Sequence, residues 1–107
     1  MKYDLHDSLI ERADYFPETG RAELKIRLCN WRQSGYRDTD PEIVCMTMIF
    51  DAVEQFEVSV SGYAFCDNEI LAVTEPDSHT VKFVFLADGD GETLTIKARK
   101  VSYAIDV

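Results

Sequence analysis

Residues 42 to 60 read EIVCMTMIFDAVEQFEVSV, and this stretch decides which fold the chain can adopt. Its first half is apolar at both odd and even positions, from Ile43 to Phe50 with only Thr47 between them as a polar residue. Successive side chains of a β-strand point to opposite faces, so such a strand needs cover on both sides. We therefore predict a central strand over residues 42–50 that is buried on both faces.

The alternation breaks at Asp51-Ala52, after which Val53 and Phe56 lie three positions apart. A shift of this kind is typical of a β-bulge, which bends a strand. We predict a bend over residues 51–55 and a further strand segment after it. Three carboxylates would cluster at this bend and are candidates for binding a partner: Asp51, Glu54 and Glu57.

A predicted hairpin lies on either side of this stretch. Residues 21–31 alternate between apolar and charged side chains, and a Pro-Glu-Thr-Gly turn separates them from a strand over residues 8–16. Residues 80–87 and 92–98 form the second hairpin around an Asp-Gly-Asp-Gly loop. Beyond it the apolar positions change from even to odd numbers at Arg99-Lys100, which indicates a second bulge or bend.

These elements predict an all-β fold of one domain. Six to eight strands, with at most one short helical turn, would form an antiparallel meander that closes as a sandwich or partial barrel. A chain of 107 residues with 46% hydrophobic composition suits a single core. That core is small, and dimerisation would be an ordinary way to bury more surface.

The charge of the chain is concentrated in its middle. The formal net charge is -9, and residues 38–81 hold ten Asp or Glu and no Lys or Arg. Nucleic acids and anionic membranes are captured by clustered Lys and Arg, so this distribution argues against both as partners. Two interpretations stay open: a solvated face that keeps the protein soluble, or a surface that meets a basic protein.

Three cysteines, Cys29, Cys45 and Cys66, are widely spaced and form no C-x-x-C pair. We interpret them as reduced thiols, at least one in the core, with Cys45 in the most apolar run. Reduced thiols and the absence of a secretory or membrane-spanning segment predict a cytoplasmic location. The chain's two histidines show no ligand spacing, so we expect neither a metal site nor a cofactor.

Two motifs suggest chemistry but have simpler explanations. His6-Asp7-Ser8 resembles a catalytic triad in composition, yet neighbouring side chains on an extended chain alternate in direction and do not converge. Residues 88–92, DGDGE, resemble part of a calcium loop but lack its remaining ligands. We expect local backbone hydrogen bonds at the first motif and a glycine-dependent hairpin turn at the second.

The strongest candidate for binding is the cluster around the protein's only tryptophan. Trp, Tyr and Arg dominate interface hot spots because they bury a large area and still form hydrogen bonds. The alternative is that the tryptophan covers the edge of the core beneath the loop over residues 33–41. The candidate residues of this cluster are Trp31, Arg32, Tyr36 and Arg37.

Four short motifs stand out in the chain: Leu5-His6-Asp7-Ser8, Leu28-Cys29-Asn30-Trp31, Ile49-Phe50-x-x-Val53-x-x-Phe56-Glu57 and Asp67-Asn68-Glu69-Ile70-Leu71. Together they resemble a group of small uncharacterised bacterial proteins, some of which are similar to immunity proteins of toxin systems. The resemblance implies a bacterial, cytoplasmic, non-enzymatic β protein, and an acidic chain is suited to neutralising a basic toxin.

The sequence thus supports one main hypothesis and two alternatives. The first is a non-catalytic module that binds a protein through the Trp31 cluster or the acidic middle. The second is a small-molecule site or carboxylate-based enzyme in the mouth of a partial barrel. The third is that the main interface is with a second copy of the chain.

Overall fold

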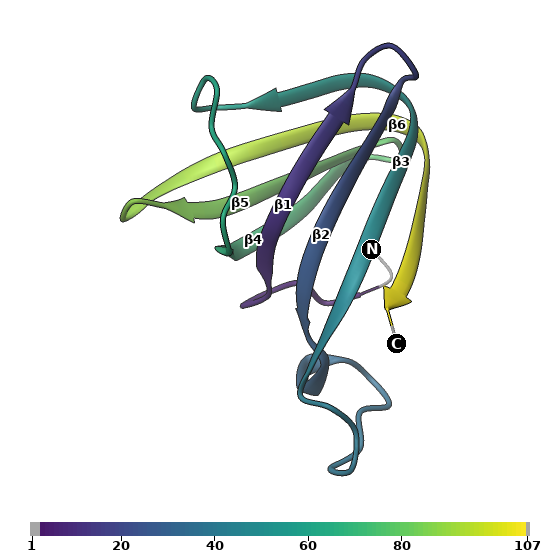
Figure 1. Cartoon of the computed structure of the whole chain (residues 1–107), viewed down its shortest axis with the longest axis vertical. Helices are drawn as coiled ribbons and strands as arrows, with labels where there is room; N and C mark the ends of the chain where they lie inside the picture. The colour runs from purple at the N-terminus through teal and green to yellow at the C-terminus, as the bar shows by residue number, and fades with distance from the viewer. Residues whose placement is uncertain (1–2, 107) are drawn as a thin grey trace.

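The computed structural model describes residues 3–106 and shows six β-strands and a single turn of 3-10 helix (Figure 1). The predicted all-β antiparallel fold is confirmed. No helix within these residues is long and apolar enough to cross a membrane. The elements are β1 (Leu9–Phe16), β2 (Arg21–Cys29), η1 (Asn30–Arg32), β3 (Ile43–Val58), β4 (Asn68–Asp77), β5 (Thr80–Ala87) and β6 (Asp90–Asp106).

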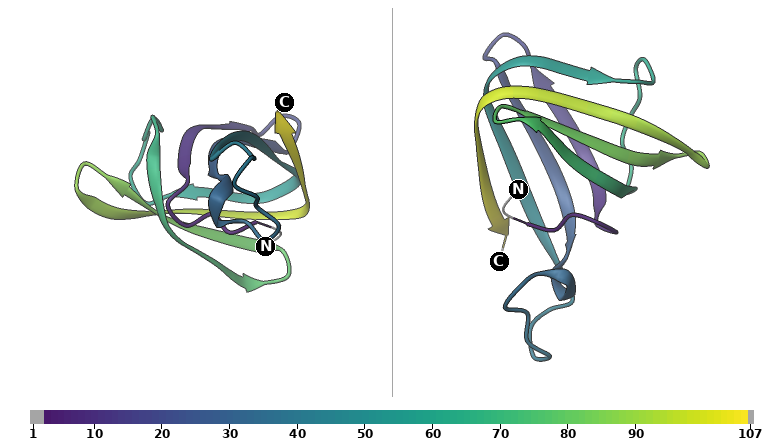
Figure 2. Two further views of the ribbon diagram at one scale, coloured as in Figure 1. Left: turned by 90° about the horizontal axis from the view of Figure 1, so that it is seen from below. Right: turned by 180° about the vertical axis from the view of Figure 1, so that it is seen from behind.

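The strands close into one irregular ring in the order β1-β2-β3-β6-β5-β4 (Figures 1 and 2). Two three-stranded units, β1-β2-β3 and β4-β5-β6, make up the ring, and both predicted hairpins lie within them. β3 and β6 join the units along nearly their whole length. On the other side the ring closes only where Leu9 and Ile10 of β1 meet Glu69 and Asn68 of β4.

β3 and β6 are the longest strands, and each of them bends near its middle. The bend lets each strand belong to both halves of the ring. Ala52 of β3 has a left-handed φ of 53°, and the register with β6 shifts between Val53 and Gln55. In β6 the inward-facing positions change from Leu94, Ile96 and Ala98 to odd-numbered residues, opposite the same place. The predicted bend of β3 and the predicted phase change of β6 are therefore one feature seen on two paired strands.

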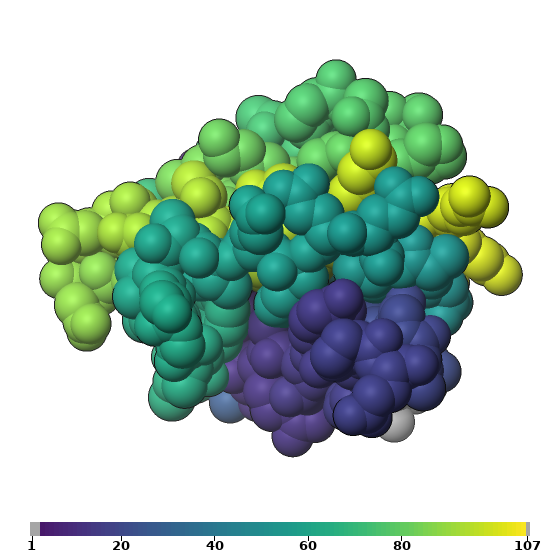
Figure 3. Space-filling view, turned by 90° about the horizontal axis from the view of Figure 1, so that it is seen from above, coloured from purple at the N-terminus to yellow at the C-terminus, as the bar shows by residue number. Residues whose placement is uncertain are grey.

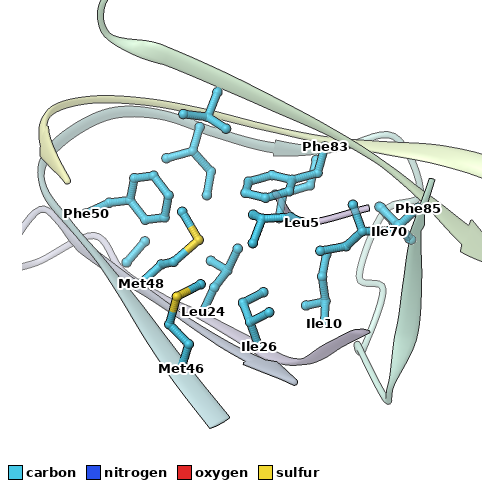
Figure 4. Packing of buried hydrophobic residues seen from close by; sticks show 14 of the residues in the cluster. Leu5, Ile10, Leu24, Ile26, Met46, Met48, Phe50, Ile70, Phe83 and Phe85 are labelled. Carbon is cyan, nitrogen blue, oxygen red and sulfur yellow. The ribbon is translucent and has the colours of Figure 1, made fainter. Parts of the chain in front are cut away.

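The inside of the ring is a continuous apolar core (Figure 4). Alternate residues of β2 and β3 point inward to meet the aromatic side chains of β5, as the alternation in sequence requires. Leu5, which lies before the first strand, is only 2% exposed and fills the space between these layers. The largest fully buried side chains of the core include Leu24, Ile26, Met46, Met48, Phe50, Phe83, Phe85, Leu94 and Ile96.

The prediction that residues 42–50 are buried on both faces is wrong. Met46, Met48 and Phe50 face the core, but Ile43 is 51% exposed on the outside and Cys45 is exposed as well. A ring of strands covers its inner face with its own opposite wall and leaves the outer face to solvent. The buried cysteine is accordingly Cys29, not Cys45.

Another boundary differs from the prediction of a strand over residues 21–31. β2 ends at Cys29, so Trp31 belongs to the 3-10 turn and not to the strand. β4 runs from Asn68 to Asp77. Pro76 is accommodated at the end of β4, where the register with β5 is irregular.

Candidate functional site

Residues 30–42, which we call the Trp31 loop, project from one end of the ring between β2 and β3 (Figure 1). The two ends of the loop are tied together, since the Asn30 amide donates to the Glu42 carbonyl at 2.8 Å and Asn30 Nδ2 donates to the Pro41 carbonyl at 2.8 Å. Turn hydrogen bonds at Gln33 and Tyr36 order the chain between them. The loop is thus ordered by its own hydrogen bonds.

Trp31 stands on the surface of this projection with 48% of its area exposed, outside the buried cluster. The guanidinium carbon of Arg32 lies 5.0 Å from the centre of the indole ring, which is a cation–π contact. Arg32 in turn donates from Nε and Nη2 to Asp7 Oδ2, at 3.1 and 2.7 Å. The arginine therefore links the exposed indole to a fixed carboxylate on the N-terminal segment.

A second link holds the base of the loop against the N-terminal segment. The Gln33 side chain accepts from the Asp4 amide at 2.9 Å and donates to the Asp4 carbonyl at 2.7 Å. The same side-chain nitrogen also donates to the carbonyl of Cys29 at 2.9 Å. Two side chains of the loop, Arg32 and Gln33, thus fix its position on the ring before any partner binds, which lowers the entropy cost of recognition.

The tip of the loop carries the remaining predicted residues, Tyr36 and Arg37. The Tyr36 hydroxyl donates to the Asp40 carbonyl at 3.4 Å, and the Arg37 amide donates to Asp40 Oδ2 at 3.0 Å. Partial burial raises the pKa of Tyr36, and the carboxylates of Glu42, Asp38 and Asp40 raise it further. The phenol thus lies in the negative field of three carboxylates of the same loop.

The three carboxylates predicted at the β3 bend have separate surroundings. The backbone register places Asp51 opposite Lys100, and Glu54 lies 3.6 Å from Lys97 Nζ and 3.8 Å from Arg99 Nε. Glu57 is exposed beyond them. The charge of Glu54 is therefore largely balanced within the chain, and this bend offers less negative surface than the sequence suggested.

The bend lies far from the Trp31 loop, at the other end of β2 (Figure 1). Seen from above, β3 there lies beside the β1–β2 turn (Figure 3). There the Val53 amide donates to the Gly20 carbonyl at 2.8 Å. The rings of Tyr15 and Phe56 stack nearby, with their centres 4.9 Å apart. The structure brings Trp31, Arg32, Tyr36 and Arg37 together on one loop and leaves Asp51, Glu54 and Glu57 outside that group.

The triad hypothesis for His6-Asp7-Ser8 finds no support in the geometry. His6 Nδ1 does lie 3.1 Å from Asp7 Oδ1, but Ser8 is fully buried. Its hydroxyl oxygen accepts a hydrogen bond from the amide of Cys29 at 2.9 Å. A hydroxyl in that position supports the backbone and cannot reach a substrate.

The Asp-Gly-Asp-Gly segment is a tight hairpin turn, in which Ala87 pairs with Asp90 across Asp88 and Gly89. Both intervening residues have positive φ, 50° and 86°, the conformation that favours Asp or Asn followed by Gly. Among residues 3–106, no group of three His, Cys, Asp or Glu side chains is placed to hold a metal ion.

Apolar side chains, Leu5 among them, fill the interior of the ring. The three buried polar residues, Ser8, Thr47 and Asn68, all form hydrogen bonds. One surface hollow reaches core-side residues of β3 and β6, among them Phe50, Ala98 and Val101. Another is a mainly apolar groove beside the Trp31 loop, lined by Pro41, Ile43, Val44, Cys45, Ile105 and Asp106.

Two residues that shape the Trp31 loop were not among the predicted site residues. Asp7 holds Arg32 from the N-terminal segment, and Gln33 reaches the backbone of Asp4. The β1–β2 hairpin, in which Leu9 pairs with Arg27, brings the segment before β1 to the end of β2, but no local sequence pattern identifies these residues as partners. Comparison with protein-family models, with curated proteins and with solved structures finds no match to this chain.

Proposed function

We propose that this chain is a non-catalytic protein-binding module that presents the Trp31 loop to a partner protein. The observation that carries the proposal is an indole that is 48% exposed while its neighbour Arg32 is held by Asp7. Exposure of a tryptophan to water is unfavourable in the unbound protein. A tryptophan that is exposed on a fixed support is suited to fill a pocket on a partner.

The surroundings of the loop favour a basic partner. Asp38, Asp40 and Glu42 act together on Tyr36, so their charges converge on one part of the loop. A positive surface on the partner would be steered to this region and would find carboxylates there to pair with. An immunity protein directed against a basic toxin, the class that the short motifs resemble, is a binding module of this kind.

The chemistry of the thiols supports a reducing, cytoplasmic setting for this binding. All three cysteines are free, and Cys45 and Cys66 are exposed. Exposed free thiols persist where the environment keeps them reduced. A cytoplasmic partner is the expectation that follows.

The test is affinity capture from the source organism with wild-type protein, Trp31→Ala and Leu86→Ala, with captured proteins quantified by mass spectrometry. Leu86 is also an exposed apolar residue, 38% exposed on β5, and serves as the matched control. We expect at least one basic protein to be enriched by wild type and Leu86→Ala and lost with Trp31→Ala. Retention of every captured protein by Trp31→Ala would contradict the proposed surface.

A further inference from the structure

After its bend, β3 has a neighbouring strand on one side only within residues 3–106. Its pairing with β2 ends where Phe50 meets Ala22, and from there to Val58 it pairs with β6 alone. We call residues 55–60 the β3 edge. Figure 3 shows the teal atoms of β3 lying uncovered between the yellow-green atoms of β6 and the purple atoms of the β1–β2 turn. The open side of β3 is therefore accessible from outside the ring.

The hydrogen bonds to β6 show which backbone groups of the β3 edge point to the open side. The Ser59 amide donates to the Thr93 carbonyl at 2.9 Å. Along an antiparallel pair, residues that bond to the neighbouring strand alternate with residues whose N–H and C=O point away from it. Ser59 and Glu57 therefore bond to β6, whereas the N–H and C=O groups of Phe56 and Val58 point away from it. An open row of such groups is a template for a further strand.

The inner side of the β3 edge is apolar and incompletely covered. Phe56 and Val58 lie opposite buried residues of β6, so their side chains face the core. The Phe56 ring stacks on that of Tyr15, which remains 37% exposed. Val60 continues the same alternation and is 36% exposed. Apolar side chains on an added strand would cover these residues.

The outer side of the β3 edge is acidic. Glu57 is exposed, and the Glu92 carboxylate of β6 accepts a hydrogen bond from the Ser59 hydroxyl. Glu54, before the edge, is balanced by nearby cations. No Lys or Arg of the described chain lies within ion-pair distance of Glu57 or Glu92. These two carboxylates therefore leave unbalanced negative charge beside the open backbone groups.

This charge decides which kind of strand fits the β3 edge. A second copy of the chain that paired along the same edge would bring Glu57 and Glu92 close to their own copies, and like charges on neighbouring strands are destabilising. A strand with Lys or Arg at its outward positions would instead place opposite charges beside both carboxylates. Its inward positions would be apolar, to cover Phe56, Val58 and Val60.

We propose that the β3 edge binds an extended segment of another protein in which basic and apolar residues alternate, and that this segment adds a strand to the sheet. Main-chain hydrogen bonds with Phe56 and Val58 hold the segment, and the two unlike sides of the edge select its alternating sequence. The β3 edge and the Trp31 loop lie at opposite ends of β2, so this binding does not depend on the loop.

The test is an NMR titration of the isotopically labelled protein with the capped peptide KVKVKVK, in which Lys and Val alternate. We expect saturable shifts of the backbone amide signals, centred on residues 55–60. The Phe56 and Val58 amides should exchange with solvent more slowly once the peptide is bound, because carbonyl groups of the added strand accept from them. The peptide EVEVEVE has the same alternation with the opposite charge and should not bind.

Two variants separate the β3 edge from general attraction to an acidic chain. Glu57→Lys should raise the Kd of KVKVKVK about tenfold, because an opposite-charge pair across the strands becomes a like-charge pair. Glu42→Lys is the matched control, since it makes the same charge change at an exposed position of the Trp31 loop and should leave the Kd nearly unchanged. Trp31→Ala should leave it unchanged as well, so failure of the proposed function does not affect the outcome here.

Four results would overturn the proposed edge. They are the absence of shifts up to millimolar KVKVKVK, shifts centred on residues 30–42, equal weakening by Glu42→Lys and Glu57→Lys, and equally tight binding of EVEVEVE. Shifts of residues 55–60 that depend on protein concentration without any peptide would also overturn it, because they would make a second copy of the chain the occupant.

Discussion

Asp7 is the residue on which the candidate surface most depends. Its carboxylate receives Arg32, its amide donates to the Ile70 carbonyl at 3.1 Å, and its carbonyl accepts from the Cys29 thiol at 3.3 Å. Its φ of 67° is left-handed, a conformation that Asp tolerates better than most residues. One residue thus joins the N-terminal segment, the ring and the Trp31 loop.

We predict that Asp7→Asn lowers stability in a pH-dependent way. Burial acts to raise the pKa of Asp7, but the hydrogen bond from Arg32 and the charges of His6 and Arg32 together bring it below the ordinary value of 3.8. An aspartate whose pKa is lowered on folding stabilises the protein above the unfolded-state value of about 3.9, and this contribution is lost as the pH falls through the folded-state pKa.

Urea unfolding of wild type and Asp7→Asn between pH 2 and pH 7 measures this contribution. The free energy of unfolding of the variant should be lower at pH 7, and the difference should shrink below about pH 4. Asp38→Asn, on the exposed tip of the loop, is the control and should change little at any pH. A difference between wild type and Asp7→Asn that stays constant from pH 7 to pH 2 would contradict this account of Asp7.

At the scale of elements, β3 makes the closed ring possible because it bends at Ala52. We predict that Ala52→Gly raises the free energy of unfolding by up to about 1 kcal/mol, since glycine removes the cost of a left-handed φ and gives back part of the gain as unfolded-state entropy. Ala52→Val should lower it. Thermal or urea unfolding provides the measurement.

Ala72→Gly is the matched control for the bend. Ala72 is likewise exposed, but it lies in β4 and is not among the residues with positive φ. Glycine there should destabilise the protein by roughly 0.5 to 1 kcal/mol. If both glycine variants destabilised the protein equally, the left-handed conformation of Ala52 would be in error.

The elements show how far the sequence could predict this fold. Strict alternation identified both hairpins, and the breaks at Asp51-Ala52 and Arg99-Lys100 located the shared bend of β3 and β6. The prediction that residues 42–50 are buried on both faces was wrong. An apolar residue on the outer face of a strand looks the same in the sequence whether or not another layer of the structure covers it. Ile43 and Cys45 show that the outer side here is open.

The candidate site was predictable only in its composition. The residues of the Trp31 cluster are of types common at interfaces, and they do lie on one loop. Their support by Asp7, like the balancing of Glu54 by Lys97 and Arg99, depends on contacts between distant segments. The contacts of Glu54 with Lys97 and Arg99 form because β3 pairs with β6, and no local sequence pattern predicts that these two strands are neighbours.

For the whole molecule, the ring is weakest where β1 meets β4. The two strands pair only around Leu9 and Ile10, and the Ile70 amide donates to the Ser8 carbonyl at 2.8 Å to complete the closure. Asn68 supports this seam from β4, since its Nδ2 donates to the Tyr63 hydroxyl at 2.6 Å and to the Leu86 carbonyl at 2.8 Å. Local opening should begin here.

Amide hydrogen exchange followed by NMR tests this weakness. We expect the Ile70 amide to exchange faster than amides at the centre of the β3–β6 pair, such as that of Met48. Asn68→Ala should widen the difference while lowering the free energy of unfolding by about 1 to 3 kcal/mol, because buried hydrogen-bonding groups lose their partner. Equal exchange at Ile70 and Met48 in both proteins would show that the ring opens only as a unit.

The most direct test of the central claim is the fluorescence of Trp31, the only tryptophan of the chain. A partner-binding role requires the indole to stand in solvent on its fixed loop. The account predicts emission close to that of indole in water and efficient quenching by acrylamide. Blue-shifted emission that acrylamide cannot quench would place Trp31 in the core and contradict the claim.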